Sequence, residues 1–147
     1  MTRLAEPAQH DVAHQFGARE ARDHWREILD RVEGGVVAVV RRTSPVVLAP
    51  RALVADALAE LYPFDVKVSV QPDEVAMWLD GVPVHGAGPT YAEAVECFLD
   101  ALVEYAQDWV ADLRHAPNHR RNGGLVAQVI MYADDRDELR TLVFGDE

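Results

Sequence analysis

Apolar residues recur every three or four positions between Ala18 and Val32, which predicts one amphipathic helix over residues 18–32. Gly34 and Gly35 follow, and glycine readily adopts the positive φ that often ends a helix. The β-branched run from residue 36 to residue 40 then predicts a buried strand. A helix followed by a strand is therefore expected in this part of the chain.

A second apolar run, residues 46–49, is separated from the first by Arg41, Arg42 and a Thr-Ser-Pro segment. This pattern predicts two antiparallel strands joined by a tight, basic turn. Apolar residues at helical spacing from Leu53 to Leu61 predict a closing helix, and residues 11–16 can supply an earlier strand. A module of about 60 residues buries only about 60% of its unfolded surface, so residues 1–61 are expected to dimerise.

The second half begins with apolar and polar residues in strict alternation over 66–70 and 75–79, with a shorter stretch at 82–84, which predicts antiparallel strands. The Gly-rich residues 86–89 are expected to break the chain. Thr90 and Glu93 have the spacing of a capping box, so a long helix should begin there and end at Pro117. Its expected buried face comprises Ala94, Val95, Phe98, Leu102, Tyr105, Ala106, Trp109 and Leu113. Apolar residues over 125–143 predict one or two further helices.

Composition narrows the functional classes. Of 147 residues, 49% are apolar and 27% charged, which is enough apolar surface for a folded core. The longest apolar runs are five residues, too short for a membrane helix, and the first residues lack a secretory signal, so the expected location is the cytoplasm. The lone Cys97 cannot form an internal disulfide or a thiolate zinc cluster, and we expect it in the core.

The net charge of −11 is divided unevenly along the chain. Residues 1–61 include eight basic and nine acidic residues, a net charge of −1. Residues 62–147 include six basic and 16 acidic residues, a net charge of −10. Uniform acidity would be expected if charge served only solubility. The asymmetry indicates two modules with two different tasks, over residues 1–61 and 62–147.

Three motifs of the first module resemble the prevent-host-death/YefM antitoxin family, a family of type II antitoxins. They are Phe-Gly-Ala-Arg-Glu-Ala-Arg at residues 16–22, the helix ending in Glu-Gly-Gly at residue 35, and the Arg-Arg-x-x-Pro hairpin at residues 41–45. The resemblance covers about residues 11–60. It implies a dimer that binds operator DNA and represses its own toxin-antitoxin operon.

The same resemblance identifies DNA-contact candidates by position, and guanidinium groups pair well with phosphate or guanine. A departure from the family pattern is Thr43-Ser44 where a glycine-lysine pair is common, which removes one positive charge. An alternative is that the hairpin arginines only protect a strand edge, and that the helix arginines pair with Glu20, Asp23 or Glu27. The candidates are Arg19, Arg22, Arg26, Arg41 and Arg42, while Trp25, Ile28, Leu29 and Val39 are expected in the core or dimer interface.

The strand order of the second module, with Gly86-x-Gly88-x-Thr90-x-x-Glu93 leading into a helix, resembles the HicB-like antitoxin domain over about residues 64–113. That resemblance implies binding to a small RNA-cleaving toxin. Residues 72–85 lack the family's usual proline-rich strand motif, and residues 114–147 look like added helices.

Five carboxylates recur every four residues along the predicted helix, with no Lys or Arg in the stripe: Glu96, Asp100, Glu104, Asp108 and Asp112. Like charges at this spacing disfavour a helix slightly, by about 0.2–0.5 kcal/mol per pair, and a basic partner would offset that cost. An acidic face would also speed capture of a basic toxin. The alternative is an ordinary solvated helix face.

No catalytic or cofactor motif is present: no Walker loop, dinucleotide glycine signature or nucleophile elbow. The carboxylates lie on a continuous helix face rather than in a pocket, and Pro117 between His115 and His119 opposes the helix that a metal pair would need. We expect neither an enzyme nor a metal or cofactor site.

The sequence thus predicts an α+β protein, with a small strand-helix-hairpin-helix module followed by a HicB-like antiparallel sheet, a long packed helix and added C-terminal helices. The predicted function is that of a type II antitoxin that neutralises a basic, RNA-cleaving protein toxin and binds operator DNA as a homodimer or higher even oligomer. The alternative is a dimeric scaffold that does not bind DNA and whose acidic helix docks a basic partner.

Overall fold

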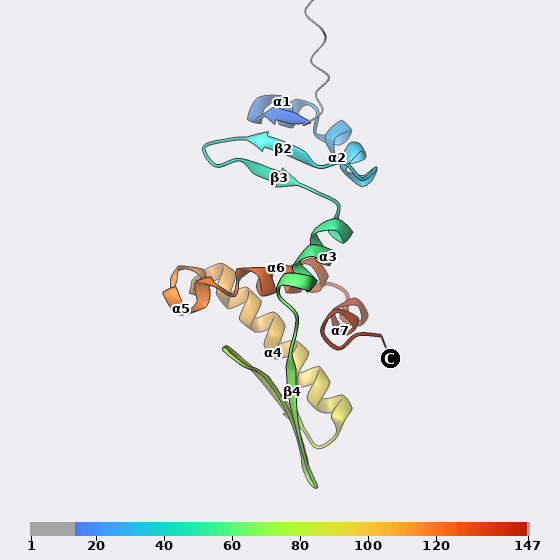
Figure 1. The fold of residues 1–147 in the computed structure, drawn as a ribbon, viewed down its shortest axis with the longest axis vertical. Coiled ribbons are helices and arrows are strands. Elements are labelled where there is room, and N and C mark those ends of the chain that lie inside the picture. The colour runs from blue at the N-terminus through green and yellow to red at the C-terminus, as the bar shows by residue number, and fades with distance from the viewer. Residues whose placement is uncertain (1–13, 147) are drawn as a thin grey trace, which may run out of the picture. The chain divides into compact units, whose positions relative to one another are not determined.

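The structure, a computed structural model, describes residues 14–146 (Figure 1). The chain divides into two compact units, unit 1 up to Val54 and unit 2 from Ala55. The division falls inside helix α3 (Arg51–Leu61), whereas the sequence places the module boundary at the end of that helix.

Before α3, the described residues of unit 1 form a three-stranded sheet and two short helices, in the order β1 (Gln15–Gly17), α1 (Ala18–Asp23), α2 (Trp25–Glu33), β2 (Ala38–Arg41) and β3 (Val46–Leu48). Strand β1 pairs parallel with β2, and β2 pairs antiparallel with β3. The predicted hairpin is confirmed. The predicted first strand is confirmed in part, because its residues 11–13 lie outside the described residues.

The predicted single helix over residues 18–32 is wrong in one respect, because the backbone leaves the helical conformation at His24 and the segment forms two helices. His24 ends α1 by donating its backbone N–H to Glu20, 3.0 Å away, and begins α2 by accepting from Ile28. Neither Asp nor His is a strong helix former, so Asp23 and His24 tolerate the break. The glycine stop is confirmed: Gly35 has a φ of 101° just beyond α2.

The core of unit 1 is small and lies between α1, α2 and one face of the sheet. Ile28 is only 1% exposed, as expected for a core residue. Trp25 and Leu29 are 46% and 37% exposed, so they do not belong to the core of this chain. The buried apolar side chains are Phe16, Ala21, Ile28, Val32, Ala38 and Val40, with Leu48 packed against them.

Unit 2 is built on an antiparallel sheet with the strand order β4 (Val66–Gln71), β5 (Glu74–Leu79) and β6 (Val82–Gly88). The alternation predicted for β5 is confirmed, since Val75, Met77 and Leu79 point into the core. The glycine-rich segment does not break the chain as predicted, because Gly86 and Gly88 lie within β6.

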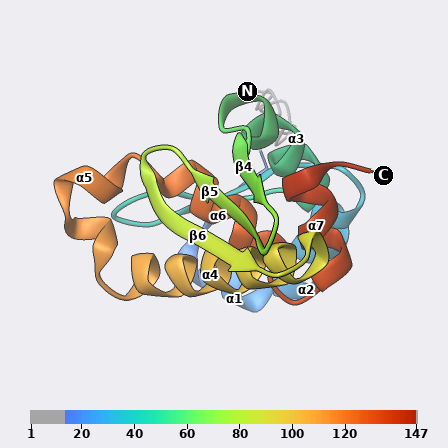
Figure 2. The same cartoon turned by 90° about the horizontal axis from the view of Figure 1, so that it is seen from below.

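Those two glycines allow a helix to lie directly against the strand. A Cβ on Gly86 would stand 2.3 Å from the backbone nitrogen of Phe98, and one on Gly88 would stand 2.9 Å from that of Ala94. Both nitrogens belong to α4 (Tyr91–Ala111), which runs beside β6 in Figure 2. Close backbone approach, not a turn, therefore explains the Gly-x-Gly spacing.

Helix α4 begins at the predicted N-cap, where the Thr90 hydroxyl oxygen accepts from the Glu93 backbone N–H at 3.2 Å. The Glu93 carboxylate accepts from the Thr90 hydroxyl, 2.8 Å away. The predicted buried face is confirmed through Ala106, whereas Trp109 and Leu113 are only half-buried. The helix ends at Ala111, and Pro117 occupies the first turn of another helix rather than ending this one.

Four short helical segments follow α4: η1 (Leu113–His115), α5 (Pro117–Arg120), α6 (Gly123–Tyr132) and α7 (Arg136–Phe144). Val126, Val129 and Leu139 complete the core that α4 shares with the sheet. The buried amide of Gln128 donates to the Tyr62 carbonyl at 2.9 Å and anchors the start of the unit to α6. No helix among residues 14–146 is long and apolar enough to cross a membrane.

Candidate functional site

Three of the five candidate arginines come together at one end of the unit 1 sheet. Because β1 and β2 are parallel, both strands finish at the same edge, where Gly17 is paired with Arg41. Arg42 follows directly, and Arg19 lies in the first turn of α1, two residues beyond Gly17. All three side chains are exposed. The topology therefore builds a basic edge from segments more than 20 residues apart, which we call the Arg19 edge.

The other two candidates extend this edge unequally. Arg22 lies three residues after Arg19 on α1 and so shares its helix face. Arg26 lies in α2, beyond the break at His24, so helical spacing does not place it with Arg22. The polar contact that the structure gives near these residues joins a Glu27 carboxylate oxygen to His24 Nδ1 at 3.5 Å, and involves neither Arg19 nor Arg22.

Apolar side chains remain exposed on unit 1. Trp25 and Leu29 lie one turn apart on α2. On the sheet, Val39 of β2 is paired with Val47 of β3, and Val47 is exposed. The predicted interface set thus contains one core residue, Ile28, and three residues with accessible surface within this chain.

The acidic stripe on α4 is divided into a paired and an unpaired part. Arg140 is hydrogen-bonded to Glu96, and Arg136 to Asp100, with Arg136 Nε also 3.6 Å from Glu96. The hydrogen bond that the Arg140 guanidinium donates to Glu96 raises the pKa of that guanidinium, and a second one, donated to Asp137 at 2.8 Å, adds to the rise. Two arginines of α7 therefore neutralise the first part of the stripe.

The stripe itself contains no Lys or Arg, but the fold brings two cations of another helix against its first part. The side chains of Glu104, Asp108 and Asp112 are exposed and, within residues 14–146, none is placed in an ion pair. We call these three the free carboxylates of α4.

An apolar groove between α4 and α6 borders the stripe. It has a volume of about 430 Å³ and is lined by Val103, Ala106, Gln107, Val110, Ile130 and Ala133. Val110 and Ile130 are 46% and 52% exposed, so apolar surface is accessible at its rim. Glu104 lies one helical turn before Gln107, which places a carboxylate at the edge of the groove.

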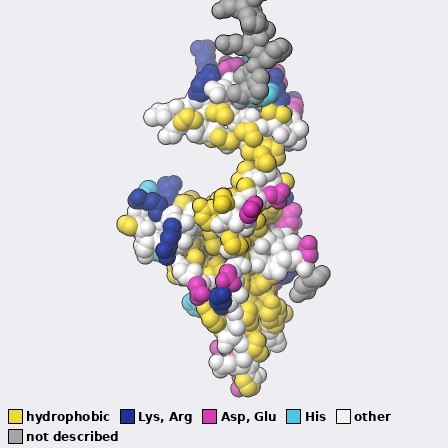
Figure 3. Space-filling view, in the orientation of Figure 1, with side chains coloured by type: hydrophobic (Ala, Val, Ile, Leu, Met, Phe, Trp, Pro, Cys, Tyr) yellow, Lys and Arg dark blue, Asp and Glu magenta, His cyan; other side chains and the backbone are white. Residues whose placement is uncertain are grey.

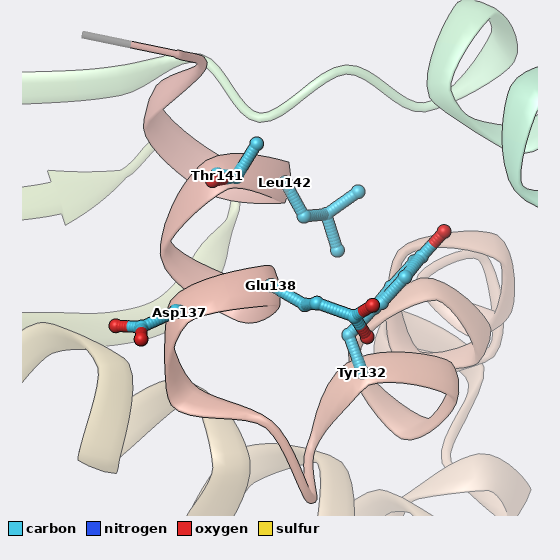
Figure 4. A pocket seen from close by; sticks show the side chains of 5 residues that line it. All are labelled: Tyr132, Asp137, Glu138, Thr141 and Leu142. Atoms are coloured by element: carbon cyan, nitrogen blue, oxygen red, sulfur yellow. The ribbon is translucent and has the colours of Figure 1, made fainter.

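A second hollow, of about 340 Å³, lies between the end of α6 and α7 (Figure 4). The side chain of Glu138 extends toward Tyr132, whereas that of Asp137 points away from both. Asp137 is engaged by Arg140, and the remaining lining residues are Thr141 and Leu142. Acid-base hydrolysis of a glycosidic bond needs two carboxyl groups that face each other. The two carboxylates of this hollow do not.

Within the described part of the chain, no group of three or more His, Cys, Asp or Glu side chains is placed to share a metal ion. Cys97 is exposed, not in the core as expected, because it lies on the solvent side of α4 next to buried Phe98.

Comparison with known proteins agrees with the fold. A family model described as "Antitoxin of toxin-antitoxin, RelE / RelB, TA system" matches residues 13–144. A crystal structure of the antitoxin part of a proposed toxin/antitoxin system from Syntrophomonas wolfei subsp. wolfei superposes with a TM-score of 0.72 at 20% identity, over 90% of this chain and 97% of that one. No curated protein sequence matches this chain. Because the family model spans nearly the whole sequence, the chain belongs to the PHD-like family of antitoxins of RelE/RelB toxin-antitoxin systems.

Proposed function

We propose that this antitoxin neutralises a basic protein toxin through unit 2 and represses its own operon through unit 1, as a dimer on operator DNA. Under this proposal unit 1 is a Phd/YefM-like DNA-binding module, and β4 to α4 form a HicB-like toxin-binding module. The proposed function requires no catalysis, metal or cofactor.

The observation that carries the DNA-binding part is the Arg19 edge. Its three arginines come from two segments that the parallel pairing of β1 with β2 brings together. Guanidinium groups at one edge can contact phosphates and guanine together, which compensates for the near-neutral charge of the N-terminal module. Two such edges in a dimer would match a two-fold symmetric operator.

The dimer is supported by the apolar side chains that unit 1 leaves exposed. Soluble monomers rarely expose contiguous apolar surface without a role in binding. We expect Leu29→Asp or Val47→Asp to lower the molar mass measured by light scattering from that of a dimer to that of a monomer. The exposed Val70→Asp in unit 2 is the control, and a dimer that survives both unit 1 substitutions would contradict this interface.

The test of DNA binding is fluorescence anisotropy with duplex DNA from upstream of the gene, against scrambled duplex. We expect selective, salt-sensitive binding that Arg41→Glu with Arg42→Glu abolishes while the dimer is retained. Lys67→Glu reverses a charge that is paired with Asp65, 2.7 Å away, and should leave binding unchanged. Selective binding that survives the double reversal would remove the Arg19 edge from the proposal, and a folded dimer without selectivity would favour the scaffold alternative.

The toxin-binding part is supported by the free carboxylates of α4 and the apolar groove beside them. A basic, amphipathic segment of the toxin would bury apolar side chains in the groove and place its cations against the carboxylates. The paired residues Glu96 and Asp100 contribute less, because Arg136 and Arg140 already occupy them.

The corresponding test neutralises the free carboxylates by Glu104→Gln, Asp108→Asn and Asp112→Asn. We expect slower association with the toxin encoded beside the antitoxin gene, and a weaker dependence of that rate on salt. The matched control neutralises three exposed carboxylates of the sheet turns, by Asp73→Asn, Glu74→Gln and Asp80→Asn. If the two triple variants changed the association rate equally, the stripe would have no specific role in toxin binding.

A further inference from the structure

Unit 2 separates its cations into two classes. It holds six basic side chains besides histidine, and three of them are paired: Lys67 with Asp65, Arg136 with Glu96 and Asp100, and Arg140 with Glu96 and Asp137. Arg114, Arg120 and Arg121 are exposed and, among residues 14–146, no ion pair includes any of them. A unit with an excess of carboxylates therefore keeps three arginines free, all within eight residues of sequence.

The chain around these arginines is free of acid. No Asp or Glu occurs from residue 113 to residue 133, although carboxylates stand on both sides, at Asp112 and Asp134. In Figure 3 one group of dark blue side chains lies over the segment that Figure 1 labels α5. We call Arg114, Arg120 and Arg121 the α5 cluster.

Hydrogen bonds to α4 hold this segment in one shape. The indole nitrogen of Trp109 donates to the His119 carbonyl at 2.9 Å, and the Tyr105 hydroxyl is hydrogen-bonded to His119 Nδ1 at 3.0 Å. Buried Asn122 donates to the same hydroxyl at 2.8 Å. Pro117 fixes the first turn of α5. The arginines therefore project from a fixed support.

We infer that the α5 cluster is a second contact to the phosphate backbone of duplex DNA, an inference that rests on the proposed function. Residues 62–147 carry a net charge of −10, so DNA bound by unit 1 would repel most of unit 2. The α5 cluster forms a face of unit 2 that attracts phosphates. The same face would repel a basic toxin, which would instead bind at the free carboxylates of α4.

The alternative occupant is the acidic stripe of a second copy of this chain. Guanidinium binds both carboxylate and phosphate in a bidentate manner, so geometry alone does not distinguish the two occupants. Phosphate is favoured because duplex DNA carries a dense line of negative charge, whereas Arg136 and Arg140 already pair with part of the acidic stripe. Contact between copies is one of the outcomes that the test distinguishes.

The test measures duplex binding by fluorescence anisotropy across a range of salt concentrations, for the full chain and its Arg114→Gln, Arg120→Gln, Arg121→Gln variant. Each lost phosphate contact lowers the slope of log affinity against log salt by about 0.9, so we expect a decrease of between about one and three. Affinity should fall at least about tenfold near 0.1 M salt for both the operator and scrambled duplex, because phosphate contacts carry no sequence information. The corresponding triple lysine variant should retain most of the slope.

The matched control is Arg136→Gln with Arg140→Gln, which removes two cations that are already paired in the same unit. It should keep the wild-type slope. If the glutamine variant does not fold, as judged by circular dichroism, the three single substitutions replace it, and each should lower the slope by about one.

The outcomes separate this inference from the proposed function. A wild-type slope in the glutamine variant, with selectivity still lost in Arg41→Glu with Arg42→Glu, overturns the inference and leaves the repressor intact. A reduced slope in a protein that never distinguishes the operator supports the inference and overturns the repressor. A changed oligomeric mass with unchanged DNA binding assigns the cluster to contact between copies and overturns the inference. Absence of duplex binding by the wild type, even at low salt, overturns both.

Discussion

Substituting Gly86 by alanine should be among the most damaging single-methyl changes in unit 2. The new Cβ would lie 2.3 Å from the backbone nitrogen of Phe98 and 2.5 Å from its Cα. Neither atom belongs to a flexible side chain, so the clash cannot be relieved by a rotamer change. Helix α4 and strand β6 must separate by about 1 Å before the nearest pair reaches the 3.4 Å of ordinary contact.

The cost has two parts that act together. Overpacking of a core costs typically about 1–3 kcal/mol. Moving α4 also opens a gap around fully buried side chains such as Met77 and Leu102, and a gap of about 0.5–1 Å forfeits a quarter to a half of each dispersion contact. We therefore expect the free energy of unfolding of unit 2 to fall by about 3 kcal/mol or more. For a unit of this size, that corresponds to a decrease in Tm of about 12 °C or more.

Urea unfolding followed by circular dichroism, with calorimetry for Tm, measures this loss. The control is Ala87→Val, which adds two carbons to the next residue of the same strand, on its exposed face, and should change stability by less than about 0.5 kcal/mol. A Gly86→Ala protein as stable as this control would refute the close approach of α4 to β6.

Three further changes test other features. Thr90→Ala removes the 3.2 Å hydrogen bond that caps α4 and should lower the free energy of unfolding of unit 2, measured in urea titrations, by about 1 kcal/mol. Thr90→Ser keeps the hydroxyl and should keep the stability, so equal losses in the two variants would contradict the cap. Ile28→Ala, at a side chain that is 1% exposed, should cost unit 1 about 2–5 kcal/mol by the same measurement, and a loss below 1 kcal/mol would contradict its burial. Arg136→Gln with Arg140→Gln leaves Glu96 and Asp100 without their arginine partners. The double variant should therefore associate faster with a basic toxin at low salt, as measured by biolayer interferometry. An unchanged association rate would mean that those carboxylates do not attract the toxin.

Local patterns predict most of the elements. Alternation over residues 75–79 identifies β5 and its buried face, and the Thr90 to Glu93 spacing identifies the start of α4. Both signals depend only on neighbouring residues, because side-chain direction repeats every two residues in a strand and about every 3.6 in a helix. Local patterns also predict the order of elements in unit 1. The exception is the break at His24, where the hydrophobic spacing continues although the backbone is not helical.

Contacts between distant residues are not visible in such patterns. Arg140 lies 44 residues from Glu96, and helical periodicity within α4 carries no information about which element packs against its stripe. The parallel pairing that brings Arg41 beside Gly17 is equally hidden, since a short β-branched run is compatible with either direction of pairing. The glycines of β6 wrongly predict a chain break, because a close approach and a turn both favour glycine and only the position of α4 distinguishes them.

The segments after α4 determine how its charge is presented. Helix α7 places Arg136 and Arg140 over the first part of the acidic stripe, which leaves that part paired. Farther along α4, Glu104, Asp108 and Asp112 stay exposed, and beyond its end η1 and α5 present Arg114, Arg120 and Arg121 with no carboxylate between them. Successive parts of one scaffold are thus paired, acidic and basic. Since none of these charged side chains belongs to the hydrophobic core, the separation of charge is a property of the surface and not of the core. Under the proposed function, a basic toxin and a DNA duplex are drawn to different parts of unit 2, so that one antitoxin can bind both at the same time.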